Sequence, residues 1–354
     1  MKLKDLGWND CYDNNGEGLC ESGLQPARVV VVDRDRCIVW NEDGAFSADI
    51  SGKFRHFSSS AADYPCAGDW VCIDQHGTDG YATITRVLPR RSFLRRKFAG
   101  KSIDYQMIGA NIDVALIVQS CHFDFNVRRL ERYLVMVNEG NIEPVLVLTK
   151  IDLISTEKLE QLILKIRNMG ISINIIALSN VTGDGVSKIR EMMIPAKTYC
   201  LVGSSGVGKS TLINQLIGHS ELETKTISET GEGRHTTVRR QLIILEQGAL
   251  LIDTPGMREI GILGASDGIE DSYSNIVELS TNCRFKDCSH TREPGCAVLK
   301  AIKSGALDQE HYDNYLKIKK ESEFNDMSYA DKRKKDKDFG RHVNAVMKLK
   351  GSNK

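Results

Sequence analysis

Short apolar runs alternate with turn residues through the N-terminal quarter of the chain. The runs cover 28–32, 36–40, 45–50, 69–74 and 82–88. Short strands at this spacing predict a small β-barrel, and the five-stranded OB-fold is the best match. Such barrels often bind RNA, although a small barrel without an RNA contact stays an open alternative. Residues 1–24 are polar and contain Gly and Asn, so we expect them to form a flexible arm.

A different pattern holds from Asp113 to Gly256, where apolar strand candidates alternate with helical segments. The strand candidates include 144–148, 173–179, 198–202 and 249–252, and a helix is expected over 211–217. This alternation predicts an α/β domain with a doubly wound parallel sheet. Farther along, 297–304 and 309–320 have the pattern of helices. The chain is therefore expected to be multidomain, with a barrel, an α/β domain and a C-terminal helical domain.

The segment after the strand candidate 198–202 matches the phosphate-binding pattern G-x-x-x-x-G-K-[ST]. It consists of Gly203, Ser204, Ser205, Gly206, Val207, Gly208, Lys209, Ser210 and Thr211. A strand, a glycine turn and a helix N-terminus aim backbone N–H groups at an anion. Lys209 would reach the outer phosphates, and the Ser210 hydroxyl would ligate Mg²⁺. The alternative is a chance glycine turn, which the flanking strand and helix disfavour.

A second motif, D-T-P-G, follows the apolar run 249–252. Asp253, at a strand end beside the phosphate loop, can hold Mg²⁺ through water, and the Gly256 amide can meet the γ-phosphate. The same four residues also form ordinary turns. Their place after a phosphate loop favours a nucleotide-sensing switch.

A third motif, T-K-I-D, closes the apolar run 144–148. Thr149, Lys150, Ile151 and Asp152 resemble the N-K-x-D sequence with which GTPases recognise guanine. Asp152 would accept hydrogen bonds from guanine N1 and N2, a donor pair that adenine lacks. Another strand candidate ends at Ser179, where GTPases place a loop over the base. Taken alone, T-K-I-D is equally consistent with a charged strand end.

The order of these motifs is unusual, because the guanine-reading residues precede the phosphate loop. Circular permutation explains this order, since the same three-dimensional site can form when the chain ends move. One consequence is that the chain leaves the switch near Gly256 and enters the C-terminal domain directly. The nucleotide state could then move that domain through a short lever.

The polar, glycine-rich segment 230–237 is expected to be the first switch loop. Thr236 or Thr237 can supply a hydroxyl that senses Mg²⁺. Met257 stands where many GTPases carry a water-positioning Gln, so the catalytic helper must come from elsewhere. His235 is the candidate, and the alternative is a solvated histidine with no role. Hydrolysis is then expected to be slow until a partner orders the loop.

The spacing C-x4-C-x-H-x5-C indicates a structural zinc site. Its ligands would be Cys283, Cys288, His290 and Cys296, which fill a tetrahedron and leave no open position for catalysis. Scattered cysteines or a disulfide are the alternatives, and ten cysteines without a signal peptide argue against disulfides. Cysteines such as Cys37, Cys72 and Cys200 lie in apolar runs and are expected to be buried core thiols.

Composition sets the remaining bounds. With 354 residues and 41% hydrophobic content, the chain can build two or three cored domains. No run approaches the ~20 apolar residues of a membrane helix, and the start lacks a signal-peptide core, so a cytoplasmic protein is expected. Net charge is zero, but 90–97 and 332–337 are basic clusters. Each alone is typical of a solvated face; together they favour contacts with RNA phosphates.

These features together resemble the ribosome small subunit-dependent GTPase A family (RsgA, also called YjeQ). The resemblance spans about residues 25–345 and rests on a barrel, then R-R-S-F-L-R-R, T-K-I-D, G-S-S-G-V-G-K-S-T, G-E-G-R-H-T-T, D-T-P-G-M-R-E and the cysteine knuckle. It implies a GTPase that binds the small ribosomal subunit and its 16S rRNA late in maturation and is stimulated by the subunit. The nucleotide would bind at 149–152 and 203–211, zinc at the knuckle, and His235 would be catalytic. Thr149 in place of Asn is a departure.

The expected domains are a flexible arm at 1–24, an RNA-binding OB barrel with a basic linker at 25–100, a permuted GTPase domain at 101–264 and a zinc-bearing helical domain at 265–354. We expect a monomer that hydrolyses GTP to GDP and phosphate, with Mg²⁺ bound alongside GTP and one structural Zn²⁺. The main alternative is an RNA-binding, GTP-dependent assembly module with little turnover, which Lys209, Ser210 and Asp253 argue against. A nucleotide kinase or ATPase is disfavoured by Asp152. A DNA-binding finger is disfavoured because the knuckle lacks the helical spacing of a base-reading finger.

Overall fold

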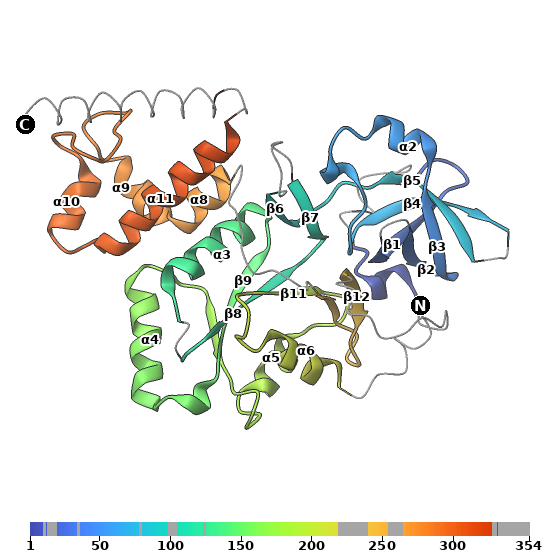
Figure 1. Ribbon diagram of the computed structural model, residues 1–354, viewed down its shortest axis with the longest axis horizontal. Coiled ribbons are helices and arrows are strands. Elements are labelled where there is room, and N and C mark those ends of the chain that lie inside the picture. Colours follow the sequence, from blue (N-terminus) through green and yellow to red (C-terminus); the bar gives the residue numbers. More distant parts are fainter. Residues whose placement is uncertain are drawn as a thin grey trace, which may run out of the picture.

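The computed structural model places three folded parts along the chain, each with its own core (Figure 1). It describes residues 1–9, 12, 20–33, 36–77, 80–97, 105–122, 125–218, 240–253, 265–327 and 331. A β-rich part comes first in the chain, an α/β part follows and a helical part comes last; in Figure 1 the barrel lies at the upper right, the helical part at the upper left and the α/β part below them.

The N-terminal part is a closed five-stranded barrel, as predicted. Its strands are β1 (Gln25–Val32), β2 (Cys37–Asn41), β3 (Gly44–Ile50), β4 (Trp70–His76) and β5 (Tyr81–Val87). They follow the order β1-β2-β3-β5-β4, and β4 pairs with β1 to close the ring. The pairs are antiparallel except β3 with β5, which is parallel. The helix α2 (Gly52–Phe57) leads from β3 toward β4.

The first residues of the chain pack against this barrel and do not form the expected flexible arm. A 3₁₀ helix, η1 (Leu3–Leu6), buries Leu6 completely. The ring centroid of Trp8 lies 4.8 Å from that of Trp70, and Tyr12 is also buried. The expectation was wrong for residues 1–9 and 12. The segment is polar on average, but it contains a few large apolar side chains that pack against Trp70. Residues 13–19 lie outside the described part.

A disulfide joins this N-terminal segment to β4, contrary to the sequence-based expectation. Cys20 and Cys72 are bonded with an S–S distance of 1.99 Å, so Cys72 is not a free core thiol. Cys37 and Cys200 are free and buried, as predicted, and burial raises the pKa of each to about 12. The two bonded residues are 52 positions apart, and no local pattern indicates that they meet.

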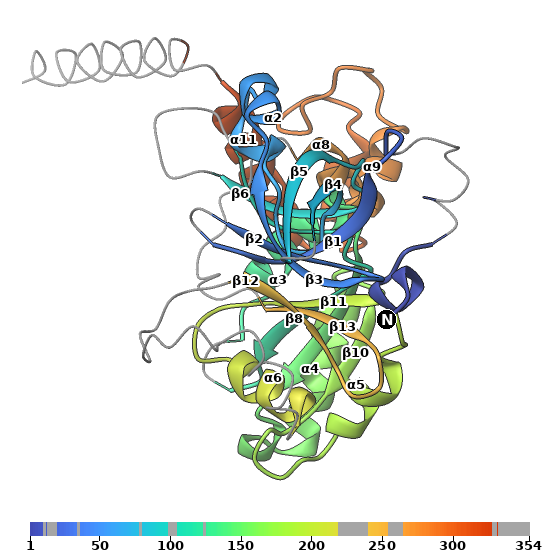
Figure 2. The same ribbon diagram turned by 90° about the vertical axis from the view of Figure 1, so that its right-hand side faces the viewer.

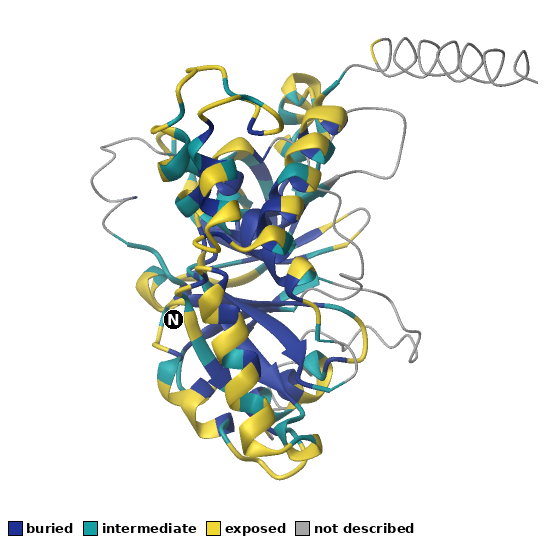
Figure 3. Cartoon of the chain, turned by 90° about the vertical axis from the view of Figure 1, so that its left-hand side faces the viewer, coloured by how far each residue is buried: buried dark blue, intermediate teal, exposed yellow. Residues whose placement is uncertain are grey.

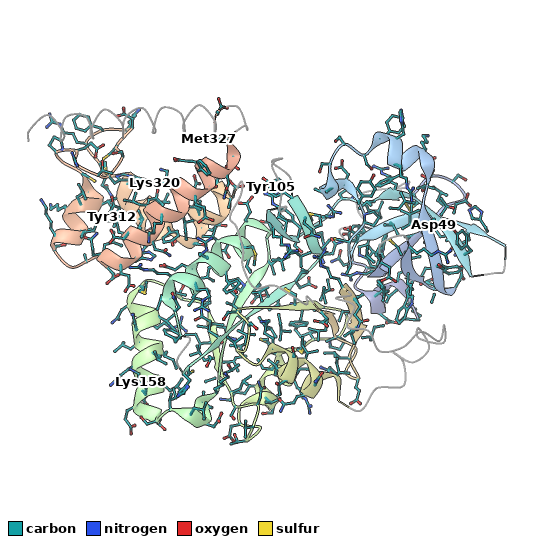
Figure 4. The ribbon with its side chains drawn as sticks, in the orientation of Figure 1. Asp49, Tyr105, Lys158, Tyr312, Lys320 and Met327 are labelled. Atoms are coloured by element: carbon teal, nitrogen blue, oxygen red, sulfur yellow. A yellow bond between two sulfur atoms is a disulfide. The ribbon has the colours of Figure 1, made fainter. Side chains whose placement is uncertain are left out.

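The basic cluster at 90–97 was predicted to contact RNA phosphates. Three of its arginines instead form ion pairs with acidic residues, so the prediction is not supported for these three. The pairs are Arg90–Asp69 at 2.7 Å, Arg91–Asp113 at 3.3 Å and Arg95–Glu139 at 3.0 Å. The guanidinium of Arg95 also lies 3.9 Å from the ring centroid of Tyr105, which Figure 4 labels. These side chains join parts of the same chain, because the acids that neutralise them are distant in sequence. The cluster at 332–337 lies outside the described residues.

A short two-stranded sheet connects the barrel to the α/β domain. It pairs β6 (Phe93–Lys97) with β7 (Tyr105–Ala110) in antiparallel register. The chain then enters the central strand β8 (Val114–Ser120), which is buried along its whole length.

The α/β domain is built on six strands in the order β10-β9-β8-β11-β13-β12. The other strands are β9 (Glu143–Thr149), β10 (Asn174–Ala177), β11 (Thr198–Val202), β12 (Arg240–Ile244) and β13 (Leu250–Asp253). Every pair is parallel except β12 with β13. β12 also pairs antiparallel with β1, so the sheet continues into the barrel (Figure 2).

Helices cover both faces of this sheet, as a doubly wound fold requires. The helices are α3 (Val127–Glu139), α4 (Thr156–Asn168), α5 (Val186–Met192) and α6 (Lys209–Ile217). Ala115 and Ile117 of β8 belong to the core shared with α3 and α4, and Leu116 and Val118 to the core shared with α5 and α6. The two-residue period of a strand explains this division. The sheet is consequently buried between the helical layers (Figure 3).

The C-terminal part consists of α8 (Ser266–Ser272), α9 (Ser274–Ser280), α10 (Ala297–Lys303) and α11 (Gln309–Asp326). It packs on α3 through a buried polar network. Glu131 of α3 accepts hydrogen bonds from His311 and Asn314, and Asn314 also donates to the Tyr273 hydroxyl at 3.1 Å. The helical domain is thereby fixed to the α/β domain. Among the described residues, no helix has the length and apolar character needed to span a membrane.

Candidate nucleotide and metal sites

The phosphate-loop candidate connects β11 to the start of α6, and its glycines adopt conformations that other residues rarely take. Gly203, Gly206 and Gly208 have φ values of 151°, 78° and 98°. A Cβ at Gly203 would lie 2.3 Å from the Val118 carbonyl oxygen. Lys209 is the first residue of α6, and its Nζ donates to the carbonyls of Gly203, at 2.7 Å, and Ser204, at 2.5 Å. The ammonium group therefore lies over the loop.

The other predicted nucleotide residues reach the same edge of the sheet. β8, β9, β10, β11 and β13 are parallel, so their carboxyl ends lie together. β9 ends at Thr149, β11 at Val202 and β13 at Asp253, and Ser179 comes two residues after β10. The structure thus brings together segments that follow an unusual order in the chain.

Thr149 links the base-reading candidate to the phosphate loop. Its side chain is fully buried, and its hydroxyl lies 2.6 Å from the Val207 carbonyl oxygen and 3.3 Å from that of Gln119. The hydroxyl can donate only one proton at a time, and the shorter contact makes Val207 the better acceptor. Lys150 then adopts a left-handed conformation with φ 61°, which turns the chain into a 3₁₀ helix, η3 (Ile151–Leu153).

Asp152 is held by a residue from the next strand. The Ser179 hydroxyl donates to Asp152 Oδ1 at 2.6 Å, while Ser179 Oγ accepts from the backbone N–H groups of Val181 and Thr182, each at 3.1 Å. Asp152 itself is exposed. A carboxylate oriented in this way is able to accept the paired N1 and N2 donors of guanine.

Asp253 stands at the end of β13 and is half-buried. Burial raises its pKa above the ordinary range of an aspartate. A cation nearby would oppose this effect, which is consistent with the predicted Mg²⁺ role. The predicted residues His235, Thr236, Thr237 and Gly256 lie outside the described residues.

Sequence reasoning overlooked one residue of this site, Asn180. Its Nδ2 donates to the Gly208 carbonyl at 3.1 Å, so a second side chain reaches the phosphate loop. Asn180 follows the predicted Ser179 directly, but the loop pattern gives no indication of where its carboxamide points.

The four predicted zinc ligands converge. Ligand atoms of Cys283, Cys288, His290 and Cys296 all lie within 4.8 Å of one another. His290 Nδ1 is 3.5 Å from the sulfurs of Cys283 and Cys296, which are 3.8 Å apart. A tetrahedral Zn²⁺ with bonds of about 2.3 Å to sulfur and about 2.0 Å to nitrogen separates sulfur from nitrogen by roughly 3.5 Å and sulfur from sulfur by roughly 3.8 Å. The donor set and its spacing therefore fit zinc.

The pKa values of the cysteine and histidine side chains in the cluster also favour binding of a cation. Burial raises the pKa of Cys283, but backbone N–H groups of Ala297 and Val298 outweigh this and the net pKa is lowered. Burial and the neighbouring thiols raise the pKa of Cys288 to about 11, because a second negative charge is unfavourable there. Burial lowers the pKa of His290, which favours the neutral ligand form. A divalent cation would relieve the repulsion between thiolates.

The knuckle is attached to the C-terminal helices through its histidine. His290 has a left-handed backbone with φ 60°, and the hydroxyl of Tyr312 donates to its carbonyl at 2.6 Å. Tyr312 is buried on α11 and is labelled in Figure 4. Cys296 caps the start of α10. The cluster is thus tied to the core of the helical domain, to which Cys296 and Tyr312 both belong.

A phosphate loop after β11, an inner strand of a mostly parallel sheet, beside the strand ends at Thr149 and Asp253, defines a P-loop GTPase. In the chain, β9 and β10, which lead to Thr149 and Ser179, precede β11, which leads to the phosphate loop, so the GTPase is circularly permuted.

Comparison with known proteins agrees with this class. The RsgA GTPase family model matches residues 87–263. A relative from Bacteroides thetaiotaomicron, named small ribosomal subunit biogenesis GTPase RsgA 1, is 39% identical over 355 residues, covering 99% of this chain and 98% of its own length. The chain belongs to the RsgA family of GTPases.

Two solved structures share the fold. The crystal structure of YjeQ from Thermotoga maritima has a TM-score of 0.61 and 25% identity, covering 83% of this chain and 97% of its own. The structure of YloQ, described as a circularly permuted GTPase, has a TM-score of 0.60 and 24% identity, covering 86% and 98% respectively.

Proposed function

We propose that this protein binds the small ribosomal subunit and its 16S rRNA late in maturation, and that the subunit stimulates its hydrolysis of GTP to GDP and phosphate. The observation that most directly supports GTP binding and hydrolysis is that T-K-I-D, Ser179, the phosphate loop and Asp253 lie at one edge of the sheet. The relatives' name, small ribosomal subunit biogenesis GTPase, supports the choice of partner. A monomer in the cytoplasm suits this role.

In this proposal the two ends of GTP are read by different loops. Asp152 accepts from guanine N1 and N2, and the stem of Lys150 covers the base. The backbone of Gly203–Thr211 cradles the phosphates, and Lys209 contacts their outer oxygens. Release of the Lys209 amine from the carbonyls of Gly203 and Ser204 would make it available to the nucleotide.

Hydrolysis proceeds by in-line attack of water on the γ-phosphorus of GTP. Lys209 and the loop amides neutralise the charge that develops on the phosphate oxygens, and the Gly256 amide donates to the γ-phosphate. His235 orients the attacking water. Ser210, Asp253 and either Thr236 or Thr237 would hold Mg²⁺, which would supply further neutralisation of the β- and γ-phosphates.

The cysteine cluster would hold one structural Zn²⁺ with all four positions filled by protein ligands, so its role would be to stabilise the C-terminal domain. That domain follows β13 and Gly256 in the chain and also packs on α3 through Glu131. Two attachments to the GTPase domain would let the nucleotide state alter how the helical domain contacts the subunit.

The test is GTP hydrolysis by the purified protein with and without purified small subunits, with ATP as the control nucleotide and Lys209→Ala as the control variant. The proposal expects strong stimulation with GTP, none with ATP and no turnover by the variant. Equal rates with and without subunits would contradict the ribosomal partner. Equal rates with ATP and GTP would contradict guanine recognition.

A further inference from the structure

Two consecutive carbonyls of the phosphate loop are held by side chains from two different strand ends. Thr149, at the end of β9, donates to Val207 O at 2.6 Å, and Asn180, beyond β10, donates to Gly208 O at 3.1 Å. The next residue, Lys209, begins α6. The Thr149 side chain has a single hydroxyl proton and no carboxamide, so it can donate to only one of the two carbonyls. The donor to the second carbonyl is the Asn180 carboxamide.

Asn180 is also held through its main chain. Gln215 Nε2, from the body of α6, donates to the Asn180 carbonyl at 2.8 Å. The Asn180 carboxamide can approach the phosphate loop closely because residue 208 is a glycine: a Cβ at Gly208 would lie 2.6 Å from Asn180 Nδ2. The base loop therefore contacts both the beginning and the body of the helix that carries Lys209.

The same residue adjoins the group that orients the base reader. Ser179 immediately precedes Asn180 and donates to Asp152 Oδ1 at 2.6 Å. A continuous path of hydrogen bonds and covalent bonds thus runs from Asp152 through Ser179 and Asn180 to Gly208 and Lys209.

We infer that Asn180 is a positioning residue for the nucleotide: its carboxamide fixes the base-reading loop against the phosphate loop, so that guanine and phosphates bind in one register. This deepens the proposed function and rests on its nucleotide site. In this role the Asn180 carboxamide acts on the nucleotide through the Gly208 carbonyl. It acts by setting the distance between Asp152, which reads the guanine 2-amino group, and Lys209.

Comparing GTP with ITP tests the inference, because inosine lacks only the 2-amino group that Asp152 would read. The variants are Asn180→Ala and Asn180→Asp in the full-length protein. Asp keeps the shape of Asn but has no N–H to donate, and its charge would face the Gly208 carbonyl. Val181→Ala is the matched control, since Val181 is the next residue and is 85% exposed. Subunit-stimulated kcat and KM are measured for both nucleotides, with thermal melts of each variant.

We expect the ratio of kcat/KM for GTP over ITP to fall about tenfold in Asn180→Ala, the size of one well-formed hydrogen bond left unmade. Asn180→Asp should lose at least as much, through a higher KM for GTP, and Val181→Ala should match the wild type. A wild-type ratio in Asn180→Asp would overturn the inference, since shape alone would then suffice. A lower melting temperature with an unchanged ratio would also overturn it, by assigning Asn180 a purely structural role. Failure of the wild type to prefer GTP over ATP would instead count against the proposed function.

Discussion

The guanidinium of Arg28 donates a hydrogen bond of 3.0 Å to the hydroxyl of Thr198, although the two residues are 170 positions apart. Arg28 belongs to the first barrel strand, and Thr198 begins the strand that leads into the phosphate loop. Arg28 is fully buried and also donates to the carbonyls of Leu6, Gly68 and Asn111. One side chain therefore joins the N-terminal segment, the barrel and the GTPase domain.

Replacing Arg28 should destabilise the junction of these parts. Burial lowers the pKa of Arg28 to about 10, which leaves it charged at neutral pH. Arg28→Ala would remove the donor to the buried carbonyls of Leu6 and Asn111, at about 1–3 kcal/mol for each, and we expect a lowered melting temperature. Arg28→Lys should recover little, because an ammonium cannot reproduce the fork of the guanidinium. Thermal unfolding followed by circular dichroism measures this, with Arg86→Ala, an exposed arginine of the same barrel, as the control. Equal melting temperatures for Arg28→Ala and the control would contradict the account.

Lys209→Ala and Ser210→Ala should each abolish GTP turnover. The first removes the ammonium group that lies over the phosphate loop, and the second removes the hydroxyl proposed to ligate Mg²⁺. Phosphate release in the presence of small subunits measures the effect, and Ser172→Ala, an exposed serine of the same domain, is the control. Undiminished subunit-stimulated hydrolysis in either variant would require another assignment of the site.

His235→Ala should keep GTP binding but slow hydrolysis. The imidazole is proposed to orient water and not to hold the nucleotide, so its loss would act on the chemical step. Binding of a fluorescent GTP analogue and single-turnover hydrolysis separate the two effects. An unchanged hydrolysis rate would remove His235 from the mechanism.

Cys288→Ala should lose zinc and destabilise the C-terminal domain. Removing one of four ligands leaves an incomplete tetrahedron and exposes the loop between α9 and α10. Metal analysis of the purified protein and limited proteolysis of the helical domain measure the outcome, with the buried free thiol variant Cys121→Ala as the control. One zinc retained per chain in Cys288→Ala would exclude this ligand set.

Much of the candidate site was predictable because its chemistry is encoded over short stretches. The run Gly203–Thr211 contains its own turn glycines, lysine and hydroxyl, and T-K-I-D and the cysteine knuckle have spacings that their ligands require. The five barrel strands were also found from local alternation. Asn180 was missed, because a polar residue in a loop can face any direction until its neighbours are known.

The sequence by itself determined which residues carry the chemistry and which segments form strands and helices, since both depend on neighbours a few positions away. Only the tertiary structure decided which distant groups meet. It joined Cys20 to Cys72, turned the arginines of the basic linker toward Asp69, Asp113 and Glu139, and packed the N-terminal segment on Trp70. These contacts bring together groups that are far apart in the chain, and their formation depends on the burial and closure of the whole fold, which no local pattern records.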